Sequence, residues 1–394
     1  MSSLTLAQVR LNHLRKQYAF EKKKPAYYEI ARDQLGLHST DYWTPYLSVW
    51  ARIGDFNAEA VFRSLNSGDR LVRLNSFRRT VHVTHKDNLG LIIKATGPRL
   101  YKDVRKNPFL KKFNDTEIKR MIGKVLKVLE SGPKRMRELK KELPEMADVL
   151  RWVFLLAAAE GKVMRASASH ARSSLTDYAL MKDWVKDFKI PDMSEEEAFV
   201  ELVHLYISKF GPADIDDLAW WIPRTKTEVK RALASLESDL TQIDLEGKTK
   251  YMTYEDADKA KGLESLATPV IWFLPYEDHL PKAFINRSWY LSENVRTKIF
   301  PQLREHYWPP KGPEPPPGFK AKGSINVSGE IRPSIWMNGE LIGRWEFEEK
   351  NKELIVVHEI FEKVHPKYDN MISRRAEELE RFVNTRLVPI SKTK

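Results

Sequence analysis

The sequence predicts a mainly α-helical fold with β-wings, an α+β architecture of three tandem winged helix-turn-helix units followed by a small C-terminal β-unit. The first observation is an order of three helices and then a β-ribbon, which occurs three times along the chain. The second is an Asn338-Gly339 turn between two hydrophobic runs, the strongest short signal for a β-hairpin. We expect four units, at residues 1–114, 115–190, 191–265 and 266–394.

The first unit has the loosest form of this order. Residues 4–20 have helical periodicity, Pro25 begins a second helix through Leu35, and a third helix is expected from about Asp41 to Ile53. The extended runs at 71–74 and 80–83 are its expected wing. A polar segment, residues 38–41, therefore lies between the second and third helices of this unit.

The second unit shows the order more clearly. Apolar residues at helical spacing predict a helix over about 116–130 with Asp115 as its N-cap. A short helix over 134–142 and a third helix that opens at Pro144 follow, and the extended residues 162–165 begin the wing. The second unit thus has every element of a winged helix-turn-helix.

The third unit has the strongest pattern. A helix around 199–206 is followed by a short helix over 215–221 and by a third helix that Thr225 or Thr227 is expected to cap. Two strands, at 240–245 and 250–254, then form a hairpin-like wing.

The C-terminal region has a different composition. Residues 268–311 are irregular and aromatic, and the proline-rich run 309–317 predicts a stiff surface loop or linker. Strands at 334–337, 340–347 and 354–358 predict a small β-unit, and a charged helix over 369–384 closes the chain.

Charge and composition narrow the function. The 394 residues contain 66 Lys and Arg against 54 Asp and Glu, a net charge of +12, which indicates an anionic partner such as nucleic acid. With no cysteine, thiolate nucleophiles and Cys-ligated metal sites are excluded. We expect a cytoplasmic protein that neither spans a membrane nor is secreted, because no apolar run is long enough and the first twenty residues lack an apolar leader.

Several common enzyme signatures are missing. The sequence has no phosphate-binding Gly-x-x-x-x-Gly-Lys-Ser/Thr loop, no Gly-x-Gly-x-x-Gly after a strand, no His-Glu-x-x-His and no Gly-x-Ser-x-Gly. Nucleotide hydrolysis, dinucleotide redox chemistry, zinc proteolysis and esterase chemistry of the hydrolase fold therefore lack their usual sequence signals. We expect no metal and no cofactor.

Four segments together resemble the tandem winged-helix DNA glycosylases of crosslink and alkylpurine repair (AlkZ/YcaQ-like). They are residues 37–52, 77–83, 206–221 and 329–345, and the resemblance extends from about residue 4 to 388. It implies a glycosylase that hydrolyses the N-glycosidic bond of a damaged base in duplex DNA, and a C-terminal unit that is β-barrel-like. The family's Gln-x-Gln or Gln-x-Asp motif corresponds to His38, Ser39 and Thr40, and its Arg-Gly-Thr to Arg78, Arg79 and Thr80.

The resemblance implies that His38, Thr40 and Asp41 are catalytic. The bond breaks through an oxocarbenium-like sugar, so His38 would accept a proton from water, Thr40 would orient that water and Asp41 would stabilise the cation. The structural alternative is that Ser39, Thr40 or Asp41 caps the following helix, as helix-start rules predict.

A second group is expected to contact DNA. Arg78, Arg79 and His82 lie on or beside the first wing, where the charges would meet phosphates; the alternative is a solvated basic face. Arg52 at the end of the motif helix, and Asp278 and Arg287 in the aromatic loop, complete the expected DNA-binding set; surface ion pairing is the alternative for the loop residues. Trp220 and Trp221 are interpreted mainly as core.

Two functions from different classes remain open at this point. The first is a DNA glycosylase of base excision repair that acts as a monomer on duplex DNA containing a damaged base. The second is a non-catalytic winged-helix DNA-binding protein or transcriptional regulator, which would need recognition helices suited to a symmetric operator and a dimer.

Overall fold

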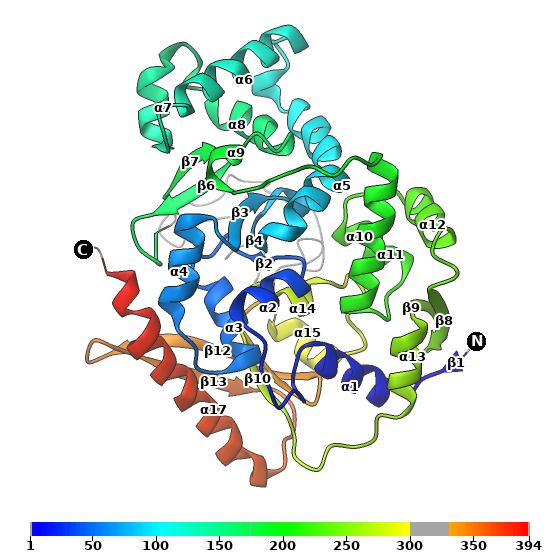
Figure 1. The fold of residues 1–394 in the computed structure, drawn as a ribbon. Helices are drawn as coiled ribbons and strands as arrows, with labels where there is room; N and C mark the ends of the chain where they lie inside the picture. The colour runs from blue at the N-terminus through cyan, green and yellow to red at the C-terminus, as the bar shows by residue number, and fades with distance from the viewer. Residues whose placement is uncertain (1, 174, 300–330, 393–394) are drawn as a thin grey trace, which may run out of the picture.

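The computed structural model describes residues 2–173, 175–299 and 331–392 (Figure 1). The fold is mixed α/β, with 50% of the residues helical and 19% in strands. The described strands form sheets of three, four and six strands. Among the described helices, none combines the length and the apolar composition that crossing a bilayer requires.

The N-terminal part of the chain contains helix, strand, helix, helix and two strands in that order, from α2 to β4. Its elements are β1 (Ser2–Ser3), α1 (Leu6–Lys16), α2 (Tyr27–Asp33), β2 (Leu37–His38), α3 (Thr44–Ile53), α4 (Ala58–Ser67), β3 (Leu71–Asn75), the 3-10 turn η1 (Phe77–Arg79) and β4 (Val81–His85).

The sequence analysis did not predict the helix α4. The helix α1 precedes the order that runs from α2 to β4. The α4 helix begins at the N-cap Asn57, whose side chain accepts from the Glu59 amide, and ends at Gly68 with φ 71°. The helix predicted from about Asp41 to Ile53 is present as α3, and α4 is an additional helix between α3 and β3. The strand β1 pairs in parallel with β8, so the N-terminus joins a distant part of the chain.

The second part begins after the long helix α5 (Lys86–Arg105), which contacts both α8 and α10. Its elements are η2 (Pro108–Leu110), α6 (Asp115–Leu129), β5 (Lys134–Arg135), α7 (Met136–Glu142), η3 (Pro144–Met146), α8 (Leu150–Ala159), β6 (Val163–Ala168), β7 (Thr176–Leu180) and α9 (Met181–Trp184). Asn114, not Asp115, is the N-cap of α6, because its side chain accepts from the Glu117 amide. This part has a hydrophobic core of its own.

The third part follows its sequence prediction closely. It comprises α10 (Glu195–Phe210), α11 (Ile215–Trp221), α12 (Lys226–Ala234), β8 (Leu240–Leu245), β9 (Lys248–Thr253) and α13 (Tyr254–Lys261). Thr225 caps α12 by accepting from the Glu228 amide, which confirms one of the two expected caps.

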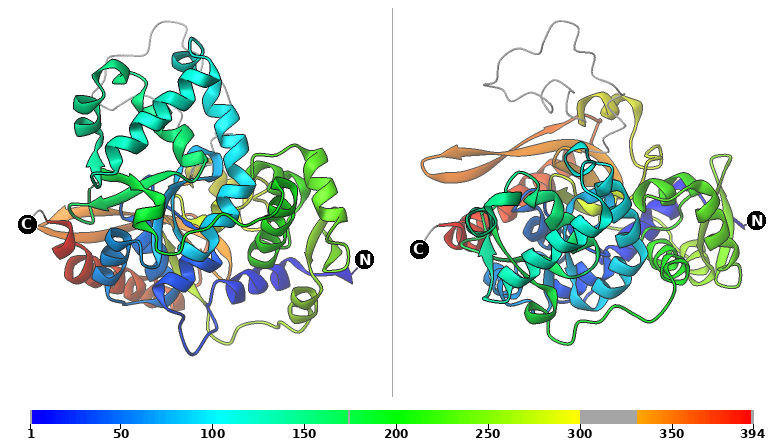
Figure 2. Two further views of the ribbon diagram at one scale, coloured as in Figure 1. Left: turned by 45° about the horizontal axis from the view of Figure 1, so that its top comes forward. Right: turned by 90° about the horizontal axis from the view of Figure 1, so that it is seen from above.

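The C-terminal part is a four-stranded antiparallel sheet with α17 packed against it (Figure 2). Its elements are β10 (Ile271–Leu274), α14 (His279–Lys282), α15 (Glu293–Ile299), β11 (Ser334–Met337), β12 (Glu340–Lys350), β13 (Glu353–Ile360), η4 (Pro366–Tyr368), α17 (Asp369–Phe382), η5 (Val383–Leu387) and η6 (Pro389–Ser391).

The hairpin prediction at Asn338-Gly339 is confirmed, since both residues have positive φ, 52° and 84°. Within the described residues the sheet is open, in the order β10-β11-β12-β13, where the sequence had indicated a barrel-like unit. The proline-rich run 309–317 lies outside the described residues.

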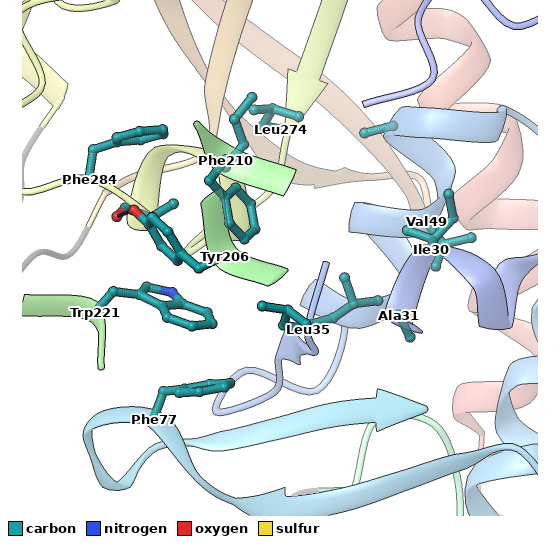
Figure 3. Packing of buried hydrophobic residues seen from close by; sticks show 14 of the residues in the cluster. Ile30, Ala31, Leu35, Val49, Phe77, Tyr206, Phe210, Trp221, Leu274 and Phe284 are labelled. Atoms are coloured by element: carbon teal, nitrogen blue, oxygen red, sulfur yellow. Dashed lines mark hydrogen bonds between the residues drawn. The ribbon is translucent and has the colours of Figure 1, made fainter. Parts of the chain in front are cut away.

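A six-stranded sheet joins the first two parts, in the order β2-β4-β3-β6-β7-β5. Its central contact is narrow, because β3 and β6 share a single register pair, Arg73 opposite Arg165. The core where the first, third and C-terminal parts meet is aromatic (Figure 3). There the ring of Phe77 stacks on Trp221 with centroids 4.0 Å apart, and Tyr206 donates to the Ala283 carbonyl at 2.5 Å.

Candidate active site

His38 lies in the short strand β2, directly opposite His82 in β4. His38 is 2% exposed, and its Nε2 is 3.2 Å from the Oγ1 of Thr40. Thr40 itself is exposed. Burial, and after it the nearby Lys282 cation, hold the pKa of His38 well below its ordinary value. The imidazole is therefore neutral at physiological pH, and the exposed Thr40 lies next to it.

A buried ion pair that the sequence analysis missed lies behind His38. Glu277, 2% exposed, places its Oε2 3.8 Å from the His38 Nε2 and forms a salt bridge with Lys282. Its other oxygen accepts from the Ile331 amide at 2.9 Å, and its backbone has φ 58°. Thr40, His38, Glu277 and Lys282 thus form a continuous polar chain from the surface into the interior.

Two more imidazoles lie next to this chain. His82 is 5.7 Å from the His38 ring and 5.6 Å from the His279 ring, and its Nδ1 is 3.1 Å from the Ser76 Oγ. Burial lowers the pKa of His82 well below its usual range and that of His279 to about 3. Because His82 is buried, it is not a DNA contact in this structure. The described residues contain no group of three or more His, Asp or Glu side chains able to hold a metal ion.

The side chain of Asp41 is bound to the start of α3, two residues before the N-cap Trp43. Its Oδ1 accepts hydrogen bonds from the backbone amides of Trp43 at 3.0 Å and Thr44 at 3.1 Å, at the start of α3. This is the structural alternative for Asp41. Of the three residues expected to be catalytic, the structure brings together only His38 and Thr40.

Arg52 and Asp278 form a buried salt bridge instead of a DNA-binding surface. The two guanidinium nitrogens of Arg52 each donate to an Asp278 oxygen at 2.9 Å, and the side chains are 1% and 0% exposed. Ser48 also donates to Asp278 at 2.7 Å. Burial alone would raise the pKa of Asp278, but the Arg52 charge and the hydrogen bonds outweigh burial and lower it. The pair ties α3 to the turn before α14. Its burial in this structure does not favour the expected contact of Arg52 and Asp278 with DNA, which stays a prediction.

The remaining expected DNA contacts gather around Trp220. Arg78, in the left-handed region with φ 53°, lies over the Trp220 ring with 4.1 Å between the guanidinium carbon and the centroid. Arg287 is buried, donates from Nε to the Phe284 carbonyl at 3.0 Å and lies 5.9 Å from the same ring. Trp221 is core as predicted, whereas Trp220 is half-buried. The side chain of Arg79 lies outside what the structure describes.

Two pockets flank these groups. One of about 160 Å³ is lined by Ser39, Thr40, Arg73 and Arg165 among others. The second, of about 440 Å³, is lined by Ser76, Arg78 and Trp220 among others. The exposed hydroxyl-bearing residue of the polar chain thus borders an arginine-lined pocket.

Comparisons with known proteins identify the family and the fold. The family model described as DNA glycosylase AlkZ-like matches residues 31–382, which is most of the chain. No protein in the curated set matches the sequence. Among solved structures, the Streptomyces sahachiroi DNA glycosylase AlkZ has a similar fold, with a TM-score of 0.73 and 16% identity over 99% of this chain and 98% of that chain. At this identity the structural match concerns the fold.

Proposed function

Because this chain belongs to the AlkZ-like DNA glycosylase family and is therefore a DNA repair glycosylase, we propose that it hydrolyses the N-glycosidic bond of a damaged base in duplex DNA through Thr40 and His38. The observation that carries the proposal is the polar chain Thr40, His38 and Glu277, with 3.2 Å between the first two groups and 3.8 Å between the last two. Thr40 and His38 lie within the segment 37–52 that resembles the family's catalytic motif.

The chain suits proton removal from a water molecule at the surface. The attacking water gives a proton to the Thr40 hydroxyl as that hydroxyl passes its own to the neutral His38 Nε2. The water oxygen bonds to C1′ of the sugar, the bond from C1′ to the base nitrogen breaks, and the base leaves with the electron pair. The proton stored on His38 finally neutralises the departed base, so the products are a free base and an abasic site.

Glu277 is the carboxylate of the proposed mechanism and acts on His38, whereas the sequence analysis expected Asp41 to stabilise the sugar cation. Once His38 is protonated, the Glu277 carboxylate, whose Oε2 is 3.8 Å from the His38 Nε2, stabilises the imidazolium electrostatically. Asp41 is committed to the two amides at the start of α3. The carboxylate of the mechanism therefore comes from the loop before α14.

Duplex binding is assigned to three repeated units. The element orders α2 to β4, α6 to β7 and α10 to β9 suit winged helices, and the C-terminal sheet suits the barrel-like unit of the family. A net charge of +12 supports phosphate contacts that do not depend on sequence, and we propose that the enzyme acts as a monomer in the cytoplasm.

The test uses duplex oligonucleotides that each carry one damaged base, followed by alkaline cleavage at abasic sites. We expect excision of at least one lesion, loss of excision in Thr40→Val and retention in Thr40→Ser, because only the hydroxyl is needed. Equal rates in Thr40→Val and wild type would remove the polar chain from the mechanism. Absence of excision across a broad lesion panel, with DNA binding intact, would favour the regulator.

A further inference from the structure

Two arginines face each other where the first two parts of the chain join in one sheet. Arg73 in β3 and Arg165 in β6 are directly opposite, and they form the single register pair between the two strands. Like charges in directly opposite cross-strand positions destabilise a sheet. Arg73 is also buried, so its charge is poorly solvated. In the free protein, the contact between the two parts therefore carries an electrostatic cost.

The partners of both arginines are uncharged. Arg73 donates to the Ala166 carbonyl at 3.2 Å, and Arg165 donates to the Asn75 Oδ1 at 3.4 Å. In the described part of the chain, neither guanidinium forms a salt bridge. Burial, and after it the charge of Arg165, lower the pKa of Arg73, but an arginine side chain in a protein stays charged. The sheet therefore holds a concentration of positive charge that stability alone would disfavour.

Two buried hydroxyls line the same pocket of about 160 Å³ as the arginines. Neither the Tyr46 Oη nor the Thr176 Oγ1 has a hydrogen-bond partner among the described residues, and the two residues are 1% and 8% exposed. Burial raises the pKa of Tyr46 to about 12, so its hydroxyl stays protonated and able to donate. Buried polar groups are normally hydrogen-bonded, so unpaired donors beside uncompensated cations indicate a binding site for an anion.

The walls of the pocket favour a phosphate among anions. Eight of the eleven lining residues carry a hydroxyl or a guanidinium, and the other three are Pro45, Leu65 and Val81. The buried donors come from four elements, α3, β3, β6 and β7. A carboxylate offers two oxygens in one plane, whereas a phosphate accepts from donors on several sides and is bound well by the arginine fork.

Thr40 borders the same pocket, so an anion bound there lies beside the group that receives the proton of the attacking water. We propose that this pocket, which we call the arginine-pair pocket, binds one backbone phosphate of the damaged DNA strand, next to the damaged nucleotide. The inference rests on the proposed function.

A phosphate held in this pocket would serve both the reaction and the fold. The C1′ atom and the phosphates on either side of it are joined through the same sugar, so fixing one phosphate positions C1′ against Thr40. The bound phosphate also offsets the repulsion between Arg73 and Arg165. DNA binding should therefore strengthen the contact between β3 and β6.

The decisive experiment measures the affinity of duplexes that contain a stable tetrahydrofuran abasic analogue and one uncharged methylphosphonate, placed in turn at each phosphate around the analogue. For the wild type we expect one position that flanks the analogue to weaken binding by roughly 10- to 100-fold, the range for a lost hydrogen bond to a charged group. Arg73→Met and Arg165→Met should bind the unmodified duplex more weakly by a similar factor. In these variants the methylphosphonate at that position should have little further effect, because the two changes remove the same contact.

Two further variants complete the design. Tyr46→Phe should lose part of the affinity for the same phosphate, while the melting temperature of the free protein stays level or rises because an unpaired buried hydroxyl has been removed. Arg344→Met, at an exposed ion pair with Glu359, is the matched control, and it should keep the full methylphosphonate effect at that position. The slope of affinity against salt should fall by about one in Arg73→Met.

Other results would overturn the proposal. Lowered melting temperatures in both arginine variants, with the methylphosphonate effect unchanged, would show that the pair is structural. Stabilisation by inorganic phosphate that Arg73→Met abolishes, without a sensitive position beside the analogue, would assign the pocket to a free phosphate and not to DNA. These titrations need no excision. A failure to excise any lesion, with the sensitive phosphate still present, would therefore count against the proposed function and support the pocket.

Discussion

The Arg52 and Asp278 pair provides the sharpest contrast between a structural and a DNA-binding role. Asp278 accepts four hydrogen bonds, two from Arg52 at 2.9 Å, one from Ser48 at 2.7 Å and one from the Leu280 amide at 3.0 Å. Removing one partner of a buried pair leaves the other charge uncompensated and costs about 3–5 kcal/mol. We therefore expect Arg52→Met to lower the free energy of unfolding by about that amount.

Urea denaturation measures this loss, and a salt titration of DNA affinity separates the two roles. A phosphate contact would steepen the salt dependence, so its removal would reduce the slope by about one. We expect an unchanged slope for the folded fraction of Arg52→Met. The double variant Arg52→Met/Asp278→Leu should recover part of the lost stability, because neither charge is left buried alone. Unchanged stability together with a reduced salt slope would refute the structural role of the buried Arg52–Asp278 salt bridge and support Arg52 as a DNA contact.

Three further outcomes follow from burial, turn geometry and charge. Burial lowers the pKa of His38, His82 and His279, so below the unfolded value of about 6.5 the unfolded state binds more protons than the folded state. The free energy of unfolding should therefore decrease as the pH is lowered below about 6.5, by up to about 1.4 kcal/mol per pH unit for each proton. Urea midpoints measured across this pH range test the prediction, and His279→Leu should show a smaller decrease. Gly339→Val should destabilise the protein by about 1–3 kcal/mol, because φ is 84° and a Cβ would lie 2.9 Å from the Arg10 Cβ. The control Gly123→Ala in α6, which has open space around the glycine, should not destabilise it, and equal melting points for the two variants would contradict this prediction. DNA affinity should fall steeply with salt and vary little with sequence, and tight binding to a single palindrome would contradict the repair function.

Local signals predicted much of the fold. The third part, its Thr225 cap and the Asn338-Gly339 hairpin depend on residues close in sequence, and each lies where it was expected. The helix α4 was missed because its signals, the cap Asn57 and the stop Gly68, were not used. The partner of β1 was out of reach because β8 lies more than 230 residues away and only tertiary packing brings the two strands together.

The candidate site shows the same division between features that local sequence predicts and features that only tertiary packing creates. His38 and Thr40 are two residues apart, and the family resemblance was enough to single them out. Glu277 follows His38 by 239 residues, so only the folded structure brings its carboxylate to the imidazole. Arg73 and Arg165 meet through a single register pair between two parts of the chain, which no local pattern encodes. Asp41 was given a catalytic role because capping and catalysis use the same residue types at a helix start.

The central claim is that the carboxylate that base excision needs is Glu277, which acts on His38, and not Asp41. The most direct test is the single-turnover excision rate of Glu277→Gln beside Asp41→Asn, each corrected for folded protein, on a lesion that the wild type excises. The account predicts a large loss of rate in Glu277→Gln with DNA affinity retained, because the carboxylate acts only once His38 becomes charged. It predicts a rate near wild type for Asp41→Asn, with a lowered melting temperature of the kind that a lost cap produces. The reverse pattern, with Asp41→Asn inactive and Glu277→Gln fully active, would contradict it.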